Sequence, residues 1–357
     1  MPVRFIFAAC QSGAERVLKD DVARSQPQWR PAFARPGFVT FRLPDERTEN
    51  APLTSAFARA SGYSYGKATG ANAAAVARDA WRVVRAELPD DTLIYVKALH
   101  VWQRVPSLPG DEGFEPGSSS PTDEASAALL ELRPELGDSW SLAVNQVATP
   151  GDFVLDCALV EPLEWWLGWH RATTIETCWP GGIPPLSAPE RLISRAYLKI
   201  QEALLWSQVP IAAGDRCIEI GSAPGGSCLA LLERGCTVIG IDPAEMDPRV
   251  LAQPGFSHLR AKAKEVKRSV FRDCRWLLMD ANVAPKYTLD TVGAIVAHSG
   301  VRPEGLLLTL KLTAPSLAAK LGSFERRIRQ WGYRRVAMRQ LAFNRQEICV
   351  VATEPKG

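Results

Sequence analysis

The chain has 357 residues, of which 46% are hydrophobic and 23% are charged, and its formal net charge is +3. That length exceeds what one ordinary hydrophobic core supports, so we expect two or three domains. The composition is that of a soluble globular protein, and no uninterrupted apolar run reaches the roughly 18 residues that a membrane-spanning helix needs.

The charges are unevenly distributed along the chain. Residues 1–185 carry 17 Lys/Arg against 23 Asp/Glu, whereas residues 186–357 carry 25 against 16. An excess of positive charge suits a polyanionic partner, although basic surfaces exposed only to solvent are also common. Charge alone therefore only suggests such a partner for the C-terminal part.

The eight cysteines are scattered, with no CxxC pair, and there are only four histidines. Several cysteines stand among aliphatic neighbours, as buried reduced thiols do. We therefore expect a cytoplasmic protein without disulfides and without a structural metal site. The start, MPVRFIFAACQSGAERVLKD, is interpreted as a first strand and helix rather than a signal peptide.

Residues 1–70 predict a small α+β unit, in the order strand, helix, strand. Residues 71–180 predict a second unit with two helices and strands that include TLIYVKALHVWQR and SWSLAVNQVA. Between these elements, residues 106–125 are rich in Pro, Gly, Ser and acid, so we expect a mobile surface insertion.

Three tryptophans, Trp165, Trp166 and Trp169, stand close together in EPLEWWLGWHRATT. Clustered tryptophans can stack on bases. At this helix-like spacing, however, we expect them to pack at a domain interface.

The segment 181–190 predicts a linker, because its prolines deny it regular structure. From residue 191 onward, strands alternate with helices, which is typical of a doubly wound α/β sheet. Two closing strands joined by a short turn at Asn344 predict an antiparallel hairpin, an ending typical of class I methyltransferases.

A glycine-rich loop follows the first of these strands, in the order Glu219, Ile220, Gly221, Ser222, Ala223, Pro224, Gly225, Gly226. Glycines there let the backbone approach a ligand. The dinucleotide pattern GxGxxG would need glycine at position 223, and the Walker pattern GK[ST] is absent. Asp242 ends the next strand, where an acid can bind a ribose diol. The glycine pattern and Asp242 together favour an S-adenosylmethionine site over an NAD site. The alternative is a glycine turn that only packs helix against sheet.

The loop resembles motif I of the FtsJ-type RNA ribose 2′-O-methyltransferases, which carry a Lys-Asp-Lys-Glu tetrad. Lys199, Asp280, Lys311 and Glu347 occur in that order, each at the helix or strand end where the family has it. The resemblance covers about 190–355. It implies a Rossmann-like class I fold, S-adenosylmethionine as cofactor and no metal. The implied cofactor-binding residues are Glu219, Gly221, Ser222, Ala223, Pro224, Gly225, Gly226, Asp242 and Asp280.

The chemistry explains why such a set is needed. A ribose 2′-hydroxyl is a poor nucleophile at neutral pH, so a group must take its proton as it attacks the methyl carbon. By resemblance, Lys311 is the base or the group that orients the hydroxyl, and Asp280 positions it. Lys199 and Glu347 complete a coupled network of charges.

Other methyl transfers lack their signatures here. The [ND]PP[YF] loop of amine methylation is replaced by DANVAPKY. Pyrimidine C5 methylation needs a cysteine nucleophile in that neighbourhood, and Cys274 lies at the other end of the strand.

The N-terminal part and the junction LSAPERLISRAYLKIQEA resemble the RlmM-like branch of the family, in which a ferredoxin-like unit and a THUMP RNA-binding unit precede the catalytic domain. This resemblance implies a ferredoxin-like unit at 1–70, a THUMP-like unit at 71–180 and methylation of a cytidine in large-subunit ribosomal RNA. The sequence departs from the family at Ala261 and Lys262, where an acid commonly reads the adenine amino group.

Two basic segments are candidates for phosphate contacts, which give affinity with little sequence choice, although they can also be solvated helix faces. We name Arg260, Lys264, Lys267, Arg268, Arg326 and Arg335 as candidate RNA-binding residues.

The sequence thus predicts an S-adenosylmethionine-dependent RNA ribose 2′-O-methyltransferase that binds ribosomal RNA and no membrane. One alternative is the same reaction on transfer RNA or another RNA. Others are a catalytically silent RNA-binding or ribosome assembly factor and, less favoured, an NAD oxidoreductase.

Overall fold

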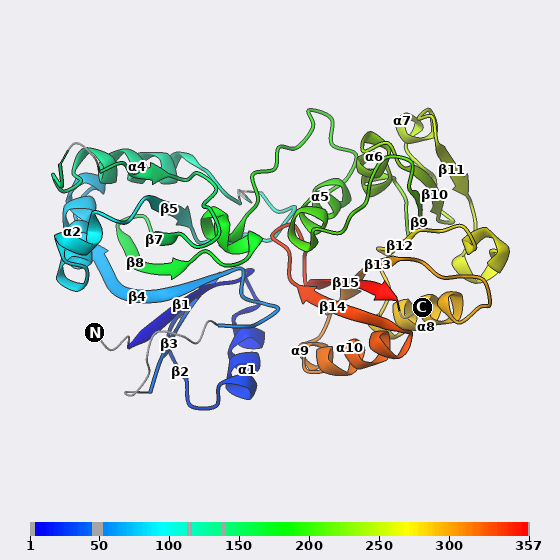
Figure 1. Cartoon of the computed structure of the whole chain (residues 1–357), viewed down its shortest axis with the longest axis horizontal. Coiled ribbons are helices and arrows are strands. Elements are labelled where there is room, and N and C mark those ends of the chain that lie inside the picture. The colour runs from blue at the N-terminus through cyan, green and yellow to red at the C-terminus, as the bar shows by residue number, and fades with distance from the viewer. Residues whose placement is uncertain (1–3, 45–52, 113, 115, 138–139, 356–357) are drawn as a thin grey trace. The chain divides into compact units, whose positions relative to one another are not determined.

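The computed structural model describes residues 4–44, 53–112, 114, 116–137 and 140–355. The chain forms two compact units, Met1–Pro185 and Leu186–Gly357, shown from blue to green and from green to red in Figure 1. The division falls in the proline-rich stretch that precedes the alternating strands and helices.

The N-terminal unit is built on one mixed sheet of eight strands. Its order is β2 (Arg30–Arg35), β3 (Phe38–Arg42), β1 (Phe5–Ala9), β4 (Ala60–Thr69), β8 (Glu164–Arg171), β7 (Phe153–Glu161), β5 (Ala98–Gln103) and β6 (Ala143–Val144). The long strand β4 pairs with β1 on one side and with β8 on the other. Strands from residues 1–70 and from 71–180 therefore share one sheet, although the sequence predicts two separate units there.

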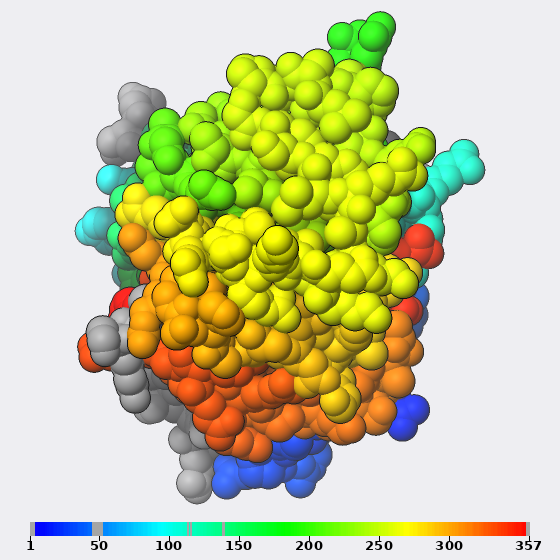
Figure 2. Space-filling view, turned by 90° about the vertical axis from the view of Figure 1, so that its right-hand side faces the viewer, coloured from blue at the N-terminus to red at the C-terminus, as the bar shows by residue number. Residues whose placement is uncertain are grey.

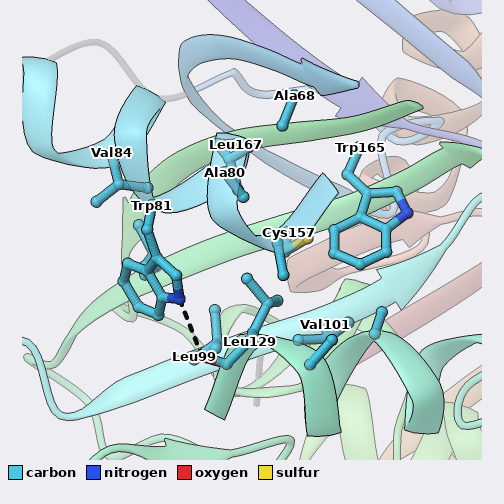
Figure 3. Close-up of a cluster of buried hydrophobic side chains, with 14 of the residues drawn as sticks. Ala68, Ala80, Trp81, Val84, Leu99, Val101, Leu129, Cys157, Trp165 and Leu167 are labelled. Carbon is cyan, nitrogen blue, oxygen red and sulfur yellow. Dashed lines mark hydrogen bonds between the residues drawn. The ribbon is translucent and has the colours of Figure 1, made fainter. Parts of the chain in front are cut away.

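Four α-helices accompany this sheet in the described part of the unit. They are α1 (Glu15–Ser25), α2 (Ala73–Glu87), α3 (Asp90–Leu93) and α4 (Ser120–Glu131), followed by 3-10 turns at Ile175–Cys178 and Pro180–Gly182. Val76, Ala80 and Val84 recur at helical spacing on the buried side of α2. They meet Leu129 of α4 and Leu167 of β8 in one hydrophobic core, which Figure 3 shows in close-up.

The three tryptophans lie on strand β8, so the helix-like interpretation of their spacing is wrong. Aromatic residues favour strands, and alternation decides which side chains face the core. Trp165 is buried in the core with α2 and α4, whereas Trp166 and Trp169 are half-buried. Trp165 therefore packs inside its own unit.

The segment 106–125 is only partly irregular, which corrects the expected mobile insertion. Its last residues form the first turns of α4, which begins after the N-cap Ser119. Thr122 and Ala125 are buried there, and the capping box between Ser119 and Thr122 explains why the helix starts early. Residues 113 and 115 lie outside the described part.

Other elements differ from the sequence prediction. The strand predicted at SWSLAVNQVA is reduced to the two residues of β6, and strands β2 and β4 were not predicted. The segment that follows β13 forms two helices, α9 (Pro315–Ala318) and α10 (Leu321–Gln330), with a break between them. Gly322 stands close to the break, and glycine weakens a helix.

The C-terminal unit is a doubly wound sheet of seven strands. Its order is β11 (Phe256–Leu259), β10 (Thr237–Ile241), β9 (Arg216–Ile220), β12 (Trp276–Met279), β13 (Gly305–Lys311), β15 (Glu347–Pro355) and β14 (Tyr333–Arg339). The first five strands run parallel, and β15 pairs antiparallel with both β13 and β14. The predicted α/β sheet with a closing antiparallel hairpin is therefore confirmed.

The other helices of this unit are α5 (Ala196–Ser207), α6 (Gly226–Glu233), α7 (Pro248–Leu251) and α8 (Pro285–Val296), with 3-10 turns at Ala263–Glu265 and Arg268–Phe271. Because the parallel strands end at one edge of the sheet, residues that follow β9, β10, β12 and β13 come together there. All eight cysteines are buried and free of disulfides. Among the described helices, none is long and apolar enough to cross a bilayer.

Candidate active site

Four charged side chains form a closed ring at the carboxyl edge of the C-terminal sheet. The Nζ of Lys199 contacts Asp280 Oδ2 and lies 2.8 Å from Glu347 Oε1. The Nζ of Lys311 lies 3.2 Å from Asp280 Oδ1 and contacts Glu347 Oε2. Each lysine thus bridges both carboxylates, and positive and negative groups alternate around the ring.

The fold explains why residues so distant in sequence meet. Lys311 ends β13, and it is the register partner of Glu347, which opens the antiparallel strand β15. Asp280 directly follows β12, which pairs with β13. Lys199 lies in the first turns of α5. The four candidate catalytic residues predicted from the sequence are therefore brought into direct contact.

Burial makes these interactions strong. The exposed fractions of the side chains are 12% for Lys199, 19% for Asp280, 18% for Lys311 and 3% for Glu347. Burial alone would lower the pKa of Lys199, but the charges of Asp280 and Glu347 outweigh it and raise the pKa. Burial would likewise raise the pKa of Asp280, but the two lysines lower it. Lys199 is therefore held as an ammonium and Asp280 as a carboxylate.

Residues that the sequence analysis did not single out for this site hold Glu347 in place. Asn344 Nδ2 donates a hydrogen bond of 3.2 Å to Glu347 Oε1, and Asn344 Oδ1 accepts one from the Leu341 N–H. The fully buried carboxylate of Glu202 accepts hydrogen bonds from the N–H groups of Ala342 and Phe343. Glu202 therefore anchors the 341–344 turn to α5, the helix that also carries Lys199.

A sequence signal for Glu202 did exist. It lies three residues after Lys199, among the apolar residues of a helix. A carboxylate in such a position is buried only when it is hydrogen-bonded.

The glycine-rich loop passes directly beside this ring. Gly221 has a φ of +82°, and a Cβ atom there would lie 2.6 Å from the carbonyl oxygen of Asp280. Cβ atoms at Gly225 and Gly226 would collide with the protein's own side chains, those of Met246 and Ser194. The glycines therefore permit close packing of loop, helix and sheet as well as any approach to a ligand.

The other loop residues differ in exposure. Pro224 is exposed, Gly221 and Ala223 are half-buried, and Ser222 is buried, where its hydroxyl faces the sulfur of Met246. Gly221, Ala223 and Pro224 are thus the loop residues whose surfaces a ligand can reach.

Glu219 lies beneath the loop. It is 2% exposed, and its carboxyl oxygens accept hydrogen bonds from the Ser227 hydroxyl and the Cys228 thiol at the start of α6. Burial raises its pKa to about 7, against the opposing effect of those two hydrogen bonds. Glu219 therefore supports the loop from below, and this geometry gives it no direct contact with a ligand above the loop.

Asp242, the acid at the end of β10, faces the same loop. One of its carboxylate oxygens accepts a hydrogen bond of 3.2 Å from the Ala223 N–H, and the other accepts one of 2.8 Å from the Ala244 N–H. Each carboxylate oxygen has a second lone pair, and the side chain is half-buried. Asp242 can therefore accept hydrogen bonds from a ribose diol without giving up its contacts to the loop, so the residues here fit an adenosine-containing cofactor.

The candidate RNA-binding residues do not form one patch. Arg260 follows β11 at one edge of the sheet, whereas Arg335 lies on β14 at the opposite edge. Lys264 and Lys267 are exposed, and Arg268 is half-buried and reaches the carbonyl oxygen of Ala263. In Figure 2 the yellow part of the chain, which includes 260–268, spans the centre of the visible face. Arg326 is exposed on α10.

Strand order and the closing antiparallel hairpin give this unit a Rossmann-like fold of the class I methyltransferase type. Residues 192–321 match the model of a family described as FtsJ-like methyltransferase, in agreement with the resemblance over about 190–355.

Curated relatives point the same way. The chain is 37% identical over 112 residues to Ribosomal RNA large subunit methyltransferase M of Halorhodospira halophila, a match that covers 30% of this chain and 32% of that protein. Proteins of the same name match from Methylococcus capsulatus (28% identity, 48% of this chain and 50% of that protein) and Azoarcus sp. (26%, 53% and 54%). The chain therefore spans about half or less of the length of these relatives.

Proposed function

We propose that the protein transfers a methyl group from S-adenosylmethionine to the 2′-hydroxyl of a ribose, that of a cytidine, in large-subunit ribosomal RNA. The observation that carries this proposal is the closed ring of Lys199, Asp280, Lys311 and Glu347 beside the glycine-rich loop. The names of the curated relatives support ribosomal RNA as the substrate.

The cofactor supplies a methyl group on a positively charged sulfur, which is already an activated leaving group. Gly221, Ala223 and Pro224 would line its site, and Asp242 would accept hydrogen bonds from its ribose diol. Asp280 both adjoins Gly221 and contacts the two lysines, so it links the cofactor loop to the acid–base groups.

The ring provides the proton chemistry that the ribose hydroxyl needs. With both lysines protonated, two ammonium groups and two carboxylates leave the ring neutral overall, so a hydroxyl can enter without meeting a net charge. Lys199 is held protonated between its two partners and stabilises them. Lys311 accepts the 2′-hydroxyl proton in its neutral amine form, or orients the hydroxyl as an ammonium group. Glu347 keeps the two lysines at a defined spacing.

The proposal includes a role for the N-terminal unit and a location. We infer that Met1–Pro185, with ferredoxin-like and THUMP-like parts, binds the RNA substrate, as the resemblance of its element order implies. We also infer a cytoplasmic protein, because eight buried free thiols suit a reducing compartment.

The test is identification of the product. Ribosomal RNA that lacks its native ribose methylations is incubated with the protein and labelled S-adenosylmethionine, then digested to nucleosides. Label in 2′-O-methylcytidine is expected. Label in a base-methylated nucleoside would overturn the proposed reaction. Label in transfer RNA alone would show that the substrate is transfer RNA and not ribosomal RNA.

A further inference from the structure

A wide groove of the N-terminal unit is lined by aromatic rings. Its volume is about 980 Å³, and its walls come from β1, β2, β3, β4, β7 and β8 and the end of α2. Six aromatic side chains besides Phe5 line it: Phe33, Tyr63, Tyr65, Phe153, Trp166 and Trp169. All six are half-buried, so each keeps part of its surface available to a ligand.

The rings are ordered by contacts with one another. Trp169 lies between Tyr63, at 4.9 Å between ring centroids, and Phe153, at 4.7 Å with an interplanar angle of 14°. Phe33 and Trp166 form a second pair at 5.0 Å. Rings held in this way lose little further conformational freedom when another flat ring stacks on them.

Cationic side chains line the groove beside the aromatic rings. Arg4, Lys67 and Arg171 line the groove with exposed side chains, and the guanidinium of Arg171 lies 5.8 Å from the Phe153 ring centroid. Glu87 is the acidic residue among the lining residues, and Lys67 is also paired with Glu164 at 2.7 Å. The excess of cations around flat apolar surfaces complements a ligand that is both aromatic and anionic.

We propose that this groove holds a single-stranded stretch of RNA. Its bases stack on the two clusters of aromatic rings that contain Trp169 and Trp166, and its phosphates lie near Arg4 and Arg171. Unpaired bases expose the faces that such rings recognise, whereas an A-form duplex hides them. The proposal rests on the proposed function, because it assigns a part of the same RNA substrate to the N-terminal unit.

The experiment measures binding of a short labelled single-stranded oligoadenylate to the full chain, with no cofactor present. Trp169→Leu is expected to weaken binding on the order of ten-fold, the value of one stacked base. Tyr95→Ala is the matched control, since Tyr95 is 77% exposed in the same unit and outside the groove. It should bind as the wild type does.

A charge variant keeps the proposal testable if Trp169→Leu fails to fold. Arg4→Glu alters an exposed side chain and should weaken binding and make it less dependent on salt, whereas Lys97→Glu, also exposed in this unit, should not. Wild-type affinity in both Trp169→Leu and Arg4→Glu would overturn the proposal. So would an amphipathic peptide that quenches tryptophan fluorescence where RNA does not, because the groove would then dock protein.

Failure of this inference and failure of the proposed function give different results. If groove variants bind RNA normally while the wild type methylates ribosomal RNA, only the groove assignment is wrong. If groove variants lose RNA binding while the wild type never yields a 2′-O-methyl nucleoside, only the proposed reaction is wrong.

Discussion

Lys311 and Glu347 are register partners on two antiparallel strands, and the Lys311 ammonium group contacts the Glu347 carboxylate. Strand pairing therefore sets the separation of their backbones, and Asn344 of the 341–344 turn adds a hydrogen bond to the Glu347 carboxylate. A site supported by strands in this way keeps its catalytic groups at a defined spacing.

Gly221→Ala should impair cofactor binding. The new Cβ atom would lie 2.6 Å from the Asp280 carbonyl oxygen at a φ of +82°, so the loop must move away from the ring. We expect the affinity for S-adenosylmethionine, measured by calorimetry, to fall about ten-fold or more. Gly214→Ala is the control, because its φ is +88° but no atom lies within 4 Å. Equal losses in both variants would show that backbone strain alone is responsible.

Glu202→Ala should destabilise the C-terminal unit. The change leaves the buried N–H groups of Ala342 and Phe343 without acceptors, which costs roughly 2–4 kcal/mol in the free energy of unfolding. Urea denaturation measures the loss. Glu202→Gln should be milder, because its amide oxygen still accepts one hydrogen bond. A loss below about 0.5 kcal/mol in Glu202→Ala would contradict the proposed anchoring of the 341–344 turn.

The N-terminal unit should lose stability as the pH rises above neutrality. Burial lowers the pKa of His170, but the Asp156 carboxylate, 2.5 Å from Nδ1, and the Thr177 carbonyl oxygen raise it above its ordinary value. The folded state then binds the proton more tightly than the unfolded state, so the stabilisation is complete below the unfolded pKa of about 6.5. It disappears as the pH rises through the folded pKa.

A variant isolates this effect from that of His100, whose ring lies 5.9 Å away and whose pKa burial lowers. We expect His170→Gln to reduce the free energy of unfolding more at pH 6 than at pH 8.5, as measured by denaturation at both pH values. A difference between wild type and variant that is the same at both pH values would contradict an ionic His170–Asp156 pair.

Much of the C-terminal fold could be predicted from the sequence, because alternating strands and helices with a glycine-rich loop specify a doubly wound sheet. The four charged residues were named from the family resemblance, and they meet because strand ends converge at one edge of the sheet. The support given by Glu202 was not predictable, because it depends on backbone N–H groups about 140 positions away. In the N-terminal unit, the spacing of residues in EPLEWWLGWHRATT suited either a helix or a strand. The segment is a strand because it pairs with β4 and β7, which the sequence does not show.

The most direct test of the central claim is the single-turnover rate of methyl transfer to ribosomal RNA, with saturating S-adenosylmethionine, in the wild type and Lys311→Ala. If Lys311 accepts the 2′-hydroxyl proton or orients the hydroxyl, the rate should fall by roughly 10²–10⁴-fold while the affinity for the cofactor stays the same. An unchanged rate in Lys311→Ala, with 2′-O-methylcytidine as the product, would contradict the role assigned to the charged ring.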